Sequence, residues 1–152
     1  MTHIAIKTNF INDKMQIPSY AHYNDSGIDL QANIDKPIHI SYGGHLLIPT
    51  GISIALPQGT PEYQWELQIR PRSGLAYKKG ITITNSPGTI DAGYRNEIGV
   101  ILHNLGTDRF TIEPGDRIAQ AVLAKSYRIN FHQVDELPED SRNLNGFGST
   151  GV

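Results

Sequence analysis

Apolar and polar residues alternate along most of this chain with a period of two residues. The clearest alternating runs lie at residues 4–6, 52–56, 63–69, 81–83 and 98–102. Because successive side chains of a β-strand point to opposite faces, this period predicts strands with one buried face. Turn-forming residues such as Asp25-Ser26-Gly27 and Glu113-Pro114-Gly115 separate the runs. The pattern therefore predicts an all-β fold, a jelly-roll-like sandwich or barrel.

A short segment at residues 73–80 departs from this period and predicts a helix. Ser73 suits the N-cap, two lysines fall in the last turn, and Gly80 suits the stop. The first amides of this helix would point toward Arg72, and a helix N-terminus beside a guanidinium attracts an anion.

The run from Arg117 to Lys125 is largely apolar on both faces. Its apolar residues are Ile118 and Val122 on one face, and Ala119, Ala121 and Leu123 on the other. A strand buried on both sides of so small a domain indicates a subunit interface. Gln120 interrupts the first face, and a buried amide needs partners, either structural ones or ligand and water.

Composition narrows the class of protein. The chain has 152 residues, the length of one domain, with a net charge of -2 that offers no basic surface for a nucleic-acid polymer. It has no cysteine, its six histidines lack a metal-ligand spacing such as His-Glu-x-x-His, and no apolar run approaches the ~18 residues of a membrane span. No secretory signal pattern opens the chain. We expect a cytoplasmic protein with a β domain at residues 1–128 and a linker and flexible C-terminal arm at 129–152.

Two segments carry charged groups and glycine that a plain β domain does not need. In Ser26-Gly27-Ile28-Asp29-Leu30, the carboxylate of Asp29 would serve a metal ion, orient an arginine, or cap its own turn. In the second segment Arg72, Ser73 and the Gly74 amide are placed to converge on one phosphate. The alternative for that segment is a helix cap with solvated arginines.

The segment from Asn85 to Arg95 predicts a tight hairpin, because an Asn-Ser-Pro-Gly turn is followed by Thr-Ile-Asp. Hairpin edge groups and the Asn85 carboxamide are suited to hydrogen bonds with a pyrimidine edge. Asp91 is the single acidic residue of the segment and a candidate general base, while Tyr94 would lie beneath a sugar. The alternative is a hairpin with a solvated Asp and a packed Tyr.

The chain ends in a glycine-rich segment with one aromatic ring, Phe147, and two hydroxyls, Ser149 and Thr150; Arg142 precedes them. A ring to stack on a base, hydroxyls for phosphate oxygens and a guanidinium for charge predict a mobile strap that orders over a nucleotide. A disordered terminus is the alternative. Without a Lys or a following helix, the segment is not a Walker-type phosphate loop.

Five motifs occur in order along the chain. They are Ser26-Gly27-Ile28-Asp29-Leu30, Pro71-Arg72-Ser73-Gly74, Gly88-Thr89-Ile90-Asp91-Ala92-Gly93-Tyr94-Arg95, Gly115-Asp116-Arg117-Ile118-Ala119-Gln120 and Gly146-Phe147-Gly148-Ser149-Thr150-Gly151. The set resembles the five motifs of the trimeric dUTPases and spans residues 26–151. The resemblance implies a homotrimer of jelly-roll-like (β-clip) subunits, with each active site at a subunit interface and closed by another subunit's arm. It also implies hydrolysis of dUTP to dUMP and diphosphate with Mg²⁺, which limits uracil incorporation into DNA and supplies dUMP for dTMP synthesis.

The resemblance also implies a role for each matching residue. Asp91 would activate the water that attacks the α-phosphorus, and Tyr94 would pack under deoxyribose. Uracil would be bound by Asn85, by the backbone at Gly88, Thr89 and Ile90, and by stacking on Phe147. The phosphates would be held by Arg72, Ser73, Gly74, Gln120, Arg142, Gly148, Ser149 and Thr150. Asp29 would act near the metal in its outer shell, and Gln120 would hold the α-phosphate or a magnesium-bound water.

The sequence departs from the family pattern at four positions: Gly93, Asn96, Asn143 and Asn145. None of them touches the implied base or the stacking ring. Other activities remain open at this point. They are a dCTP deaminase or two-step dCTP enzyme on the same fold, a nucleotide-gated regulatory protein, and a structural jelly-roll subunit.

Overall fold

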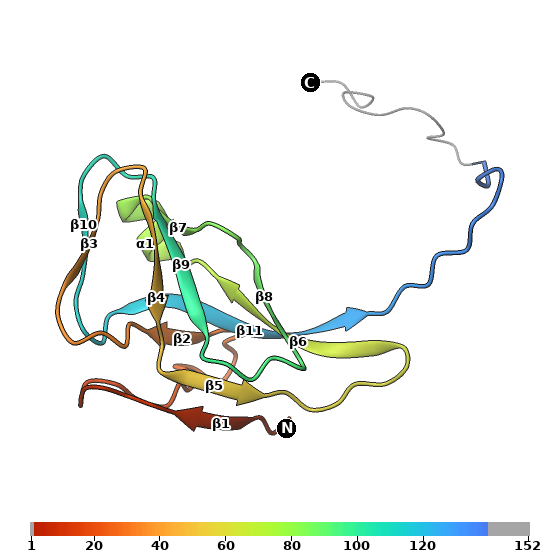
Figure 1. Cartoon of the computed structure of the whole chain (residues 1–152), viewed down its shortest axis with the longest axis horizontal. Coiled ribbons are helices and arrows are strands. Elements are labelled where there is room, and N and C mark those ends of the chain that lie inside the picture. Colours follow the sequence, from red (N-terminus) through yellow and green to blue (C-terminus); the bar gives the residue numbers. More distant parts are fainter. Residues whose placement is uncertain (1, 140–152) are drawn as a thin grey trace.

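The computed structural model describes residues 2–139 and shows a mostly β architecture with a single short helix in that range. The elements in chain order are β1 (Ala5–Thr8), β2 (Ile28–Gln31), β3 (Ile38–Ile40), β4 (His45–Pro49), β5 (Ile52–Ala55), β6 (Tyr63–Arg70), α1 (Ser73–Lys79), β7 (Ile81–Ile83), β8 (Gly88–Asp91), β9 (Gly99–Asn104), β10 (Phe110–Ile112) and β11 (Arg117–Tyr127) (Figure 1). Within residues 2–139, no helix has the length and apolar character needed to cross a bilayer.

The strands form four small antiparallel sheets. Their strand orders are β2-β11-β6-β8, β4-β9-β7, β1-β5 and β10-β3. The longest ladder joins β6 to β11 and extends from the Gln120–Arg70 pair to the Tyr127–Tyr63 pair. Since β11 also pairs with β2, the four-stranded sheet brings together segments from both ends and the middle of the domain.

The core confirms the alternating pattern for most of the predicted runs. Ile52, Ile54 and Leu56 are buried, as are the isoleucines of β7, and Val100 and Leu102 of β9. The run at residues 4–6 is an exception: β1 forms, but all four of its residues are exposed. It pairs with β5 as an outer strand of a two-stranded sheet, and its apolar residue Ile6 stays 39% exposed.

The apolar faces of β11 are only partly buried. Ile118, Ala119 and Ala121 are at most 1% exposed, which confirms burial on both faces for the first half of the strand. This burial comes from the chain's own residues, so the sequence pattern does not by itself require a partner. Val122 and Leu123, in the second half of the strand, are half-buried.

Two local predictions near the site are wrong. Arg72, and not Ser73, takes the N-cap position of α1: its backbone is extended, and its carbonyl accepts the first helical bond from Ala76 N at 3.0 Å. The predicted tight hairpin in the segment from Asn85 to Arg95 is also absent, because β8, which lies in that segment, pairs with β6, while β7 pairs with β9. The turn carries the chain from one sheet to another. The predicted stop at Gly80 is confirmed by its left-handed φ of 66°.

Candidate functional site

An arginine–aspartate cluster lies where β2, β11 and the end of β6 meet. Asp29 of β2 is opposite Gln120 of β11, which is in turn opposite Arg70. Arg72 follows β6 by two residues, and its Nε donates to Asp29 Oδ1 at 2.9 Å. Of the roles left open by the sequence, Asp29 therefore adopts that of orienting an arginine.

Arg117 completes this cluster, although the sequence analysis assigned no role to this residue of the fourth motif. Its Nη1 lies 3.4 Å from Asp29 Oδ2, and its carbonyl oxygen accepts a bond from Arg72 Nη1 at 2.9 Å. The side chains of Arg72 and Asp29 are about one-third exposed, at 28% and 32%. Asp29 thus holds two guanidinium groups at a surface that solvent, or an anion, still reaches.

Gln120 is fixed by contacts on both sides of its amide. Its Nε2 donates to the carbonyl of Pro71 at 2.9 Å. Its Oε1 lies against Gly27, where an added Cβ would approach it to 2.5 Å. Gly27 therefore has a packing reason to be glycine: it leaves space for the Gln120 amide. Gln120, Asp29, Gly27 and Arg117 line a hollow of about 490 Å³, within the usual range of ligand pockets.

The first turn of α1 lies next to this cluster in the chain. Ser73 and Gly74 are exposed, and the first amides of a helix have no intrahelical partner. Nothing within 4 Å would crowd a Cβ at Gly74, so packing inside this chain gives no reason for a glycine there. The predicted phosphate-binding trio of Arg72, Ser73 and Gly74 is thus contiguous and accessible.

A second group of predicted residues gathers around the start of β8. Asn85, Gly88, Thr89 and Ile90 line one small hollow together with apolar residues of β6, β7 and β9. Gly88 is buried, and a Cβ there would lie 3.2 Å from Asn85 Nδ2. The hollow measures about 30 Å³, little more than one or two waters need. A whole base would therefore need further walls from outside the described residues.

Asp91 ends β8 and is exposed. It lies opposite Glu66 of β6, whose carboxylate accepts a bond from Gln68 Nε2 at 2.6 Å. The Asp91 carbonyl accepts a bond from Tyr94 N at 3.0 Å, and Tyr94 Oη donates to the Glu97 carbonyl at 2.8 Å. The turn that follows Asp91 is therefore held by the backbone and by a partly exposed tyrosine, and the Asp91 carboxylate faces solvent.

One family departure lies in this turn. Nothing within 4 Å would crowd a Cβ at Gly93, so the chain accommodates a side chain there as readily as glycine. The predicted arm residues Arg142, Phe147, Gly148, Ser149 and Thr150, with Asn143 and Asn145, lie outside the described residues.

The strand register separates Asp91 from the arginine cluster. Asp91 is opposite Glu66, whereas Gln120 is opposite Arg70, four residues further along β6. Four residues correspond to about 13 Å, and two strand spacings from β8 to β11 add about 10 Å across, so the Cα atoms of Asp91 and Gln120 are roughly 16 Å apart. A general base must come within about 3 Å of the water that it deprotonates. Within residues 2–139 of one chain, the two side chains are therefore not in contact with each other.

Residues 2–139 offer no ready-made metal cage. In that part of the chain, no three His, Cys, Asp or Glu side chains are grouped so as to hold an ion. The carboxylate of Asp29 lies against two arginines. Any Mg²⁺ would then take most of its ligands from phosphate and water, which is its usual manner of binding at nucleotide sites.

Comparison with known proteins gives matches over nearly the whole chain. A family model described as dUTPase matches residues 13–151. Deoxyuridine 5'-triphosphate nucleotidohydrolase of Rickettsia bellii (strain OSU 85-389) is 56% identical over 154 residues, covering 100% of this chain and 97% of the relative. The protein of the same name from Clostridium tetani is 50% identical over 151 residues, covering 99% of each.

Solved structures of low identity share the fold. The Staphylococcus bacteriophage 80alpha dUTPase with dUpNHpp has a TM-score of 0.83 at 23% identity, with 100% of both chains covered. A mutant dUTPase of phage phi11 of S. aureus, described with a structural Mg(II) ion, has a TM-score of 0.72 at 19% identity, covering 89% of this chain and 99% of that one. These likenesses confirm the β architecture that the alternating pattern predicts.

Proposed function

The chain belongs to the dUTPase family, and we propose that it performs the family reaction at sites shared between the copies of a homotrimer. The reaction itself, hydrolysis of dUTP to dUMP and diphosphate, follows from the family and from full-length relatives of that name. These matches do not favour a dCTP deaminase, a two-step dCTP enzyme or a structural jelly-roll subunit. The cytoplasm is our proposed location.

The observation that carries the shared site is the roughly 16 Å between Asp91 and Gln120 within one chain. With Arg72 and Gln120 holding the α-phosphate, we assign the carboxylate that activates the water to another copy. A closed ring of three copies repeats one such contact three times and leaves no contact surface unused.

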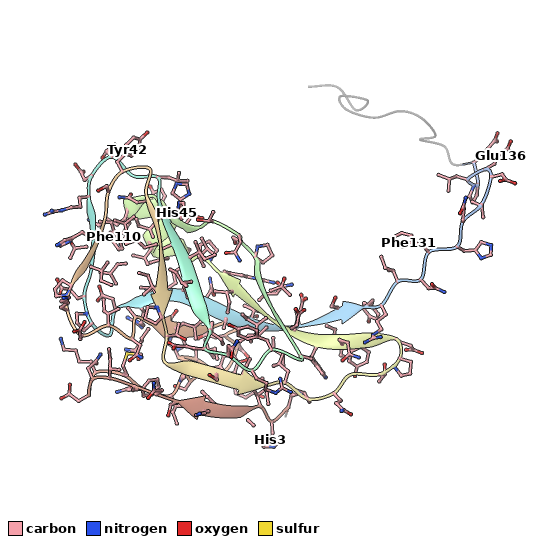
Figure 2. The ribbon with its side chains drawn as sticks, viewed as in Figure 1. His3, Tyr42, His45, Phe110, Phe131 and Glu136 are labelled. Atoms are coloured by element: carbon pink, nitrogen blue, oxygen red, sulfur yellow. The ribbon has the colours of Figure 1, made fainter. Side chains whose placement is uncertain are left out.

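The segment after β11 supports the same assembly. Residues 129–139 leave the sheets and extend away from the domain (Figure 1). They carry Ile129, Phe131 and Leu137, which are 76%, 88% and 84% exposed, and Figure 2 shows Phe131 far from the body. Apolar side chains in this position are best covered by a neighbouring subunit, and the segment then delivers the arm at residues 142–152 to a neighbour's site.

In the proposed mechanism, Asp91 accepts a proton from the water as its oxygen attacks the α-phosphorus. The bond from that phosphorus to the bridging oxygen breaks, and diphosphate leaves with that oxygen. The uracil edge is bound by the Asn85 carboxamide and by the backbone from Gly88 to Ile90. Tyr94, which its bond to Glu97 holds in place, packs under the deoxyribose and leaves no room for a 2'-hydroxyl.

Positive charge and free amides hold the triphosphate. Arg72, oriented by Asp29, acts with the Ser73 and Gly74 amides and with Gln120 on the phosphates. The arm adds Arg142, Gly148, Ser149 and Thr150, and Phe147 stacks on uracil. Transfer of this kind depends mainly on positioning and on preorganised charge.

The donor set around Asp29 and Gln120 fits Mg²⁺ in an outer-shell role. Both residues line the hollow of about 490 Å³ and carry side-chain oxygen, the ligand atom that Mg²⁺ prefers. Asp29 and Gln120 would hold waters of an ion that the triphosphate itself binds. Bound Mg²⁺ would offset phosphate charge.

The deciding experiment measures diphosphate release by the purified full chain from dUTP, dTTP, dCTP and UTP, with Mg²⁺ and with EDTA. We expect strong preference for dUTP, loss of turnover in EDTA, and no ammonia from dCTP. Light scattering should give three times the chain mass. A monomer that hydrolyses dUTP would refute the shared site while leaving the activity intact.

Gly27→Ala tests the position of the Gln120 amide. The added Cβ would lie 2.5 Å from Gln120 Oε1, so the amide must turn away and lose its bond to Pro71. Because the obstructing atom ends a flexible side chain, we expect a change in unfolding free energy below about 1 kcal/mol. Loss of a hydrogen bond to a charged phosphate lowers kcat/KM by about 10–100-fold. Unchanged kinetics would exclude a role for Gln120 in binding phosphate.

Phe147→Ala tests the arm. Loss of base stacking costs about 1–3 kcal/mol, which corresponds to about a 5–150-fold fall in kcat/KM for dUTP. The melting temperature should stay that of the unsubstituted protein. Phe131→Ala is the companion variant, because Phe131 lies on the segment that leads to the arm. We expect it to lower the stability of the trimer but to leave kcat/KM unchanged once the trimer is fully assembled. If Phe147→Ala has the same kcat/KM for dUTP as the unsubstituted protein, the Phe147 ring does not bind the base.

A further inference from the structure

Two histidines that are far apart in the sequence face each other on the outer side of the β4-β9-β7 sheet. His45 begins β4 and is directly opposite His103 of β9 in the antiparallel ladder. Directly opposed residues project from the same face, with Cβ atoms about 4.5–5.5 Å apart. The two ring centroids are 6.1 Å apart, and the ring planes meet at 70°.

This separation suits a metal ion held between the rings. An imidazole nitrogen binds zinc at about 2.0–2.1 Å, which puts the ion about 3.2 Å from the ring centroid. Two rings that bind the same ion can therefore have centroids up to about 6.4 Å apart. The observed 6.1 Å is within that reach. His45 is exposed, so its ring has room to turn toward a narrower ligand angle.

The surroundings leave both rings available. Within residues 2–139, neither ring forms a hydrogen bond to another group, in contrast to His39, whose Nδ1 lies 2.9 Å from Thr111 Oγ1. On the side of β9 away from β4, Thr82 of β7 is directly opposite His103. Its hydroxyl is suited to a hydrogen bond with a metal-bound water. The next pair on the same face is Leu47 and Ile101, and an apolar flank of this kind restricts water around a bound ion.

We propose that His45 and His103 together bind a divalent transition metal, Zn²⁺, Ni²⁺ or Cu²⁺, with water in the remaining positions. Imidazole selects these ions, with Cu²⁺ bound most tightly, while Mg²⁺ requires oxygen ligands. The site shares no residue with the proposed nucleotide site and is independent of it. A bound ion bridges β4 to β9 and stabilises the folded chain.

The test is a Zn²⁺ titration of the nucleotide-free, untagged full chain by calorimetry. A free α-amine close to His3 would bind metal ions together with the His3 imidazole and compete with the proposed site. Every protein compared therefore carries His3→Gln, which removes that competing imidazole. We expect one Zn²⁺ per chain, with affinity reduced at least about ten-fold by His45→Gln or by His103→Gln. His39→Gln is the matched control and should keep the affinity. At Zn²⁺ ten-fold above Kd, the melting temperature should rise by about 3–6 °C.

A spectroscopic measurement separates a two-histidine site from ordinary surface binding. With Cu²⁺ the electron paramagnetic resonance spectrum should show two coupled nitrogens, and one nitrogen in His45→Gln. If His103→Gln fails to fold, the exposed His45 carries the test alone. Equal Zn²⁺ affinity in His45→Gln and His39→Gln, or a single nitrogen in the parent protein, would overturn the proposal.

Discussion

Asp91→Asn is expected to lower kcat for dUTP by about 10²–10⁴-fold, the usual contribution of a general base. Asparagine keeps the size of the side chain but cannot accept the proton of the attacking water. Because Asp91 is exposed at the end of β8, the change should leave the melting temperature unaltered. Binding of a non-hydrolysable dUTP analogue, measured by calorimetry, should also persist.

Glu66→Gln is the matched control for that variant. Glu66 is the carboxylate directly opposite Asp91 in the ladder, so it shares the local charge but is engaged by Gln68. We expect its kcat to stay within about three-fold of the unsubstituted protein, a change under 1 kcal/mol in the barrier. Near-normal turnover by Asp91→Asn would show that the base lies elsewhere.

Arg72→Ala is expected to lower kcat/KM for dUTP by about 10²–10³-fold, the cost of removing one preorganised donor to the charged reacting group. The folded state should change little, because the Arg72–Asp29 pair is partly exposed and such pairs contribute at most about 1 kcal/mol. Arg117 also remains near Asp29. Steady-state kinetics and thermal unfolding measure the two quantities separately.

Arg70→Ala controls for the loss of one positive charge in the same segment. Arg70 is exposed and donates to Gln68 at the end of β6, so it lies two residues from Arg72 without touching Asp29. Its kcat/KM should remain close to that of the unsubstituted protein. An equal loss in both variants would reduce the role of Arg72 to general electrostatic attraction.

Mixing the two inactive proteins tests whether the site is shared. In mixed trimers, Asp91→Asn chains still carry the native Arg72, and Arg72→Ala chains still carry the native Asp91. A shared site that takes each residue from the chain in which it is native is complete. Random equal mixing in a closed ring makes about a quarter of the sites complete in this way, so roughly a quarter of the activity should return. A site contained in one chain would give no recovery at any mixing ratio.

Local patterns predict the strands well where a single face is buried against the chain's own core. Residues 52–56 and 98–102 show this, because alternation reports burial directly. The pattern fails where burial depends on distant partners. β1 alternates yet stays exposed, and the turn at residues 84–87 leads into a strand of another sheet, because β6 and β9 occupy the pairing positions.

The sequence by itself determined the chemical inventory: one acid in a β-turn segment, an arginine ahead of a short helix, and an amide within an apolar strand. Only the tertiary structure decided which of these groups meet. It places Arg72 on Asp29, 43 residues away in the chain. It also places Asp91 opposite Glu66 of β6, four residues from Arg70, the β6 residue nearest to the arginine–aspartate cluster. The reason is that strand register is set by long-range pairing and shared burial, which no local run of residues records.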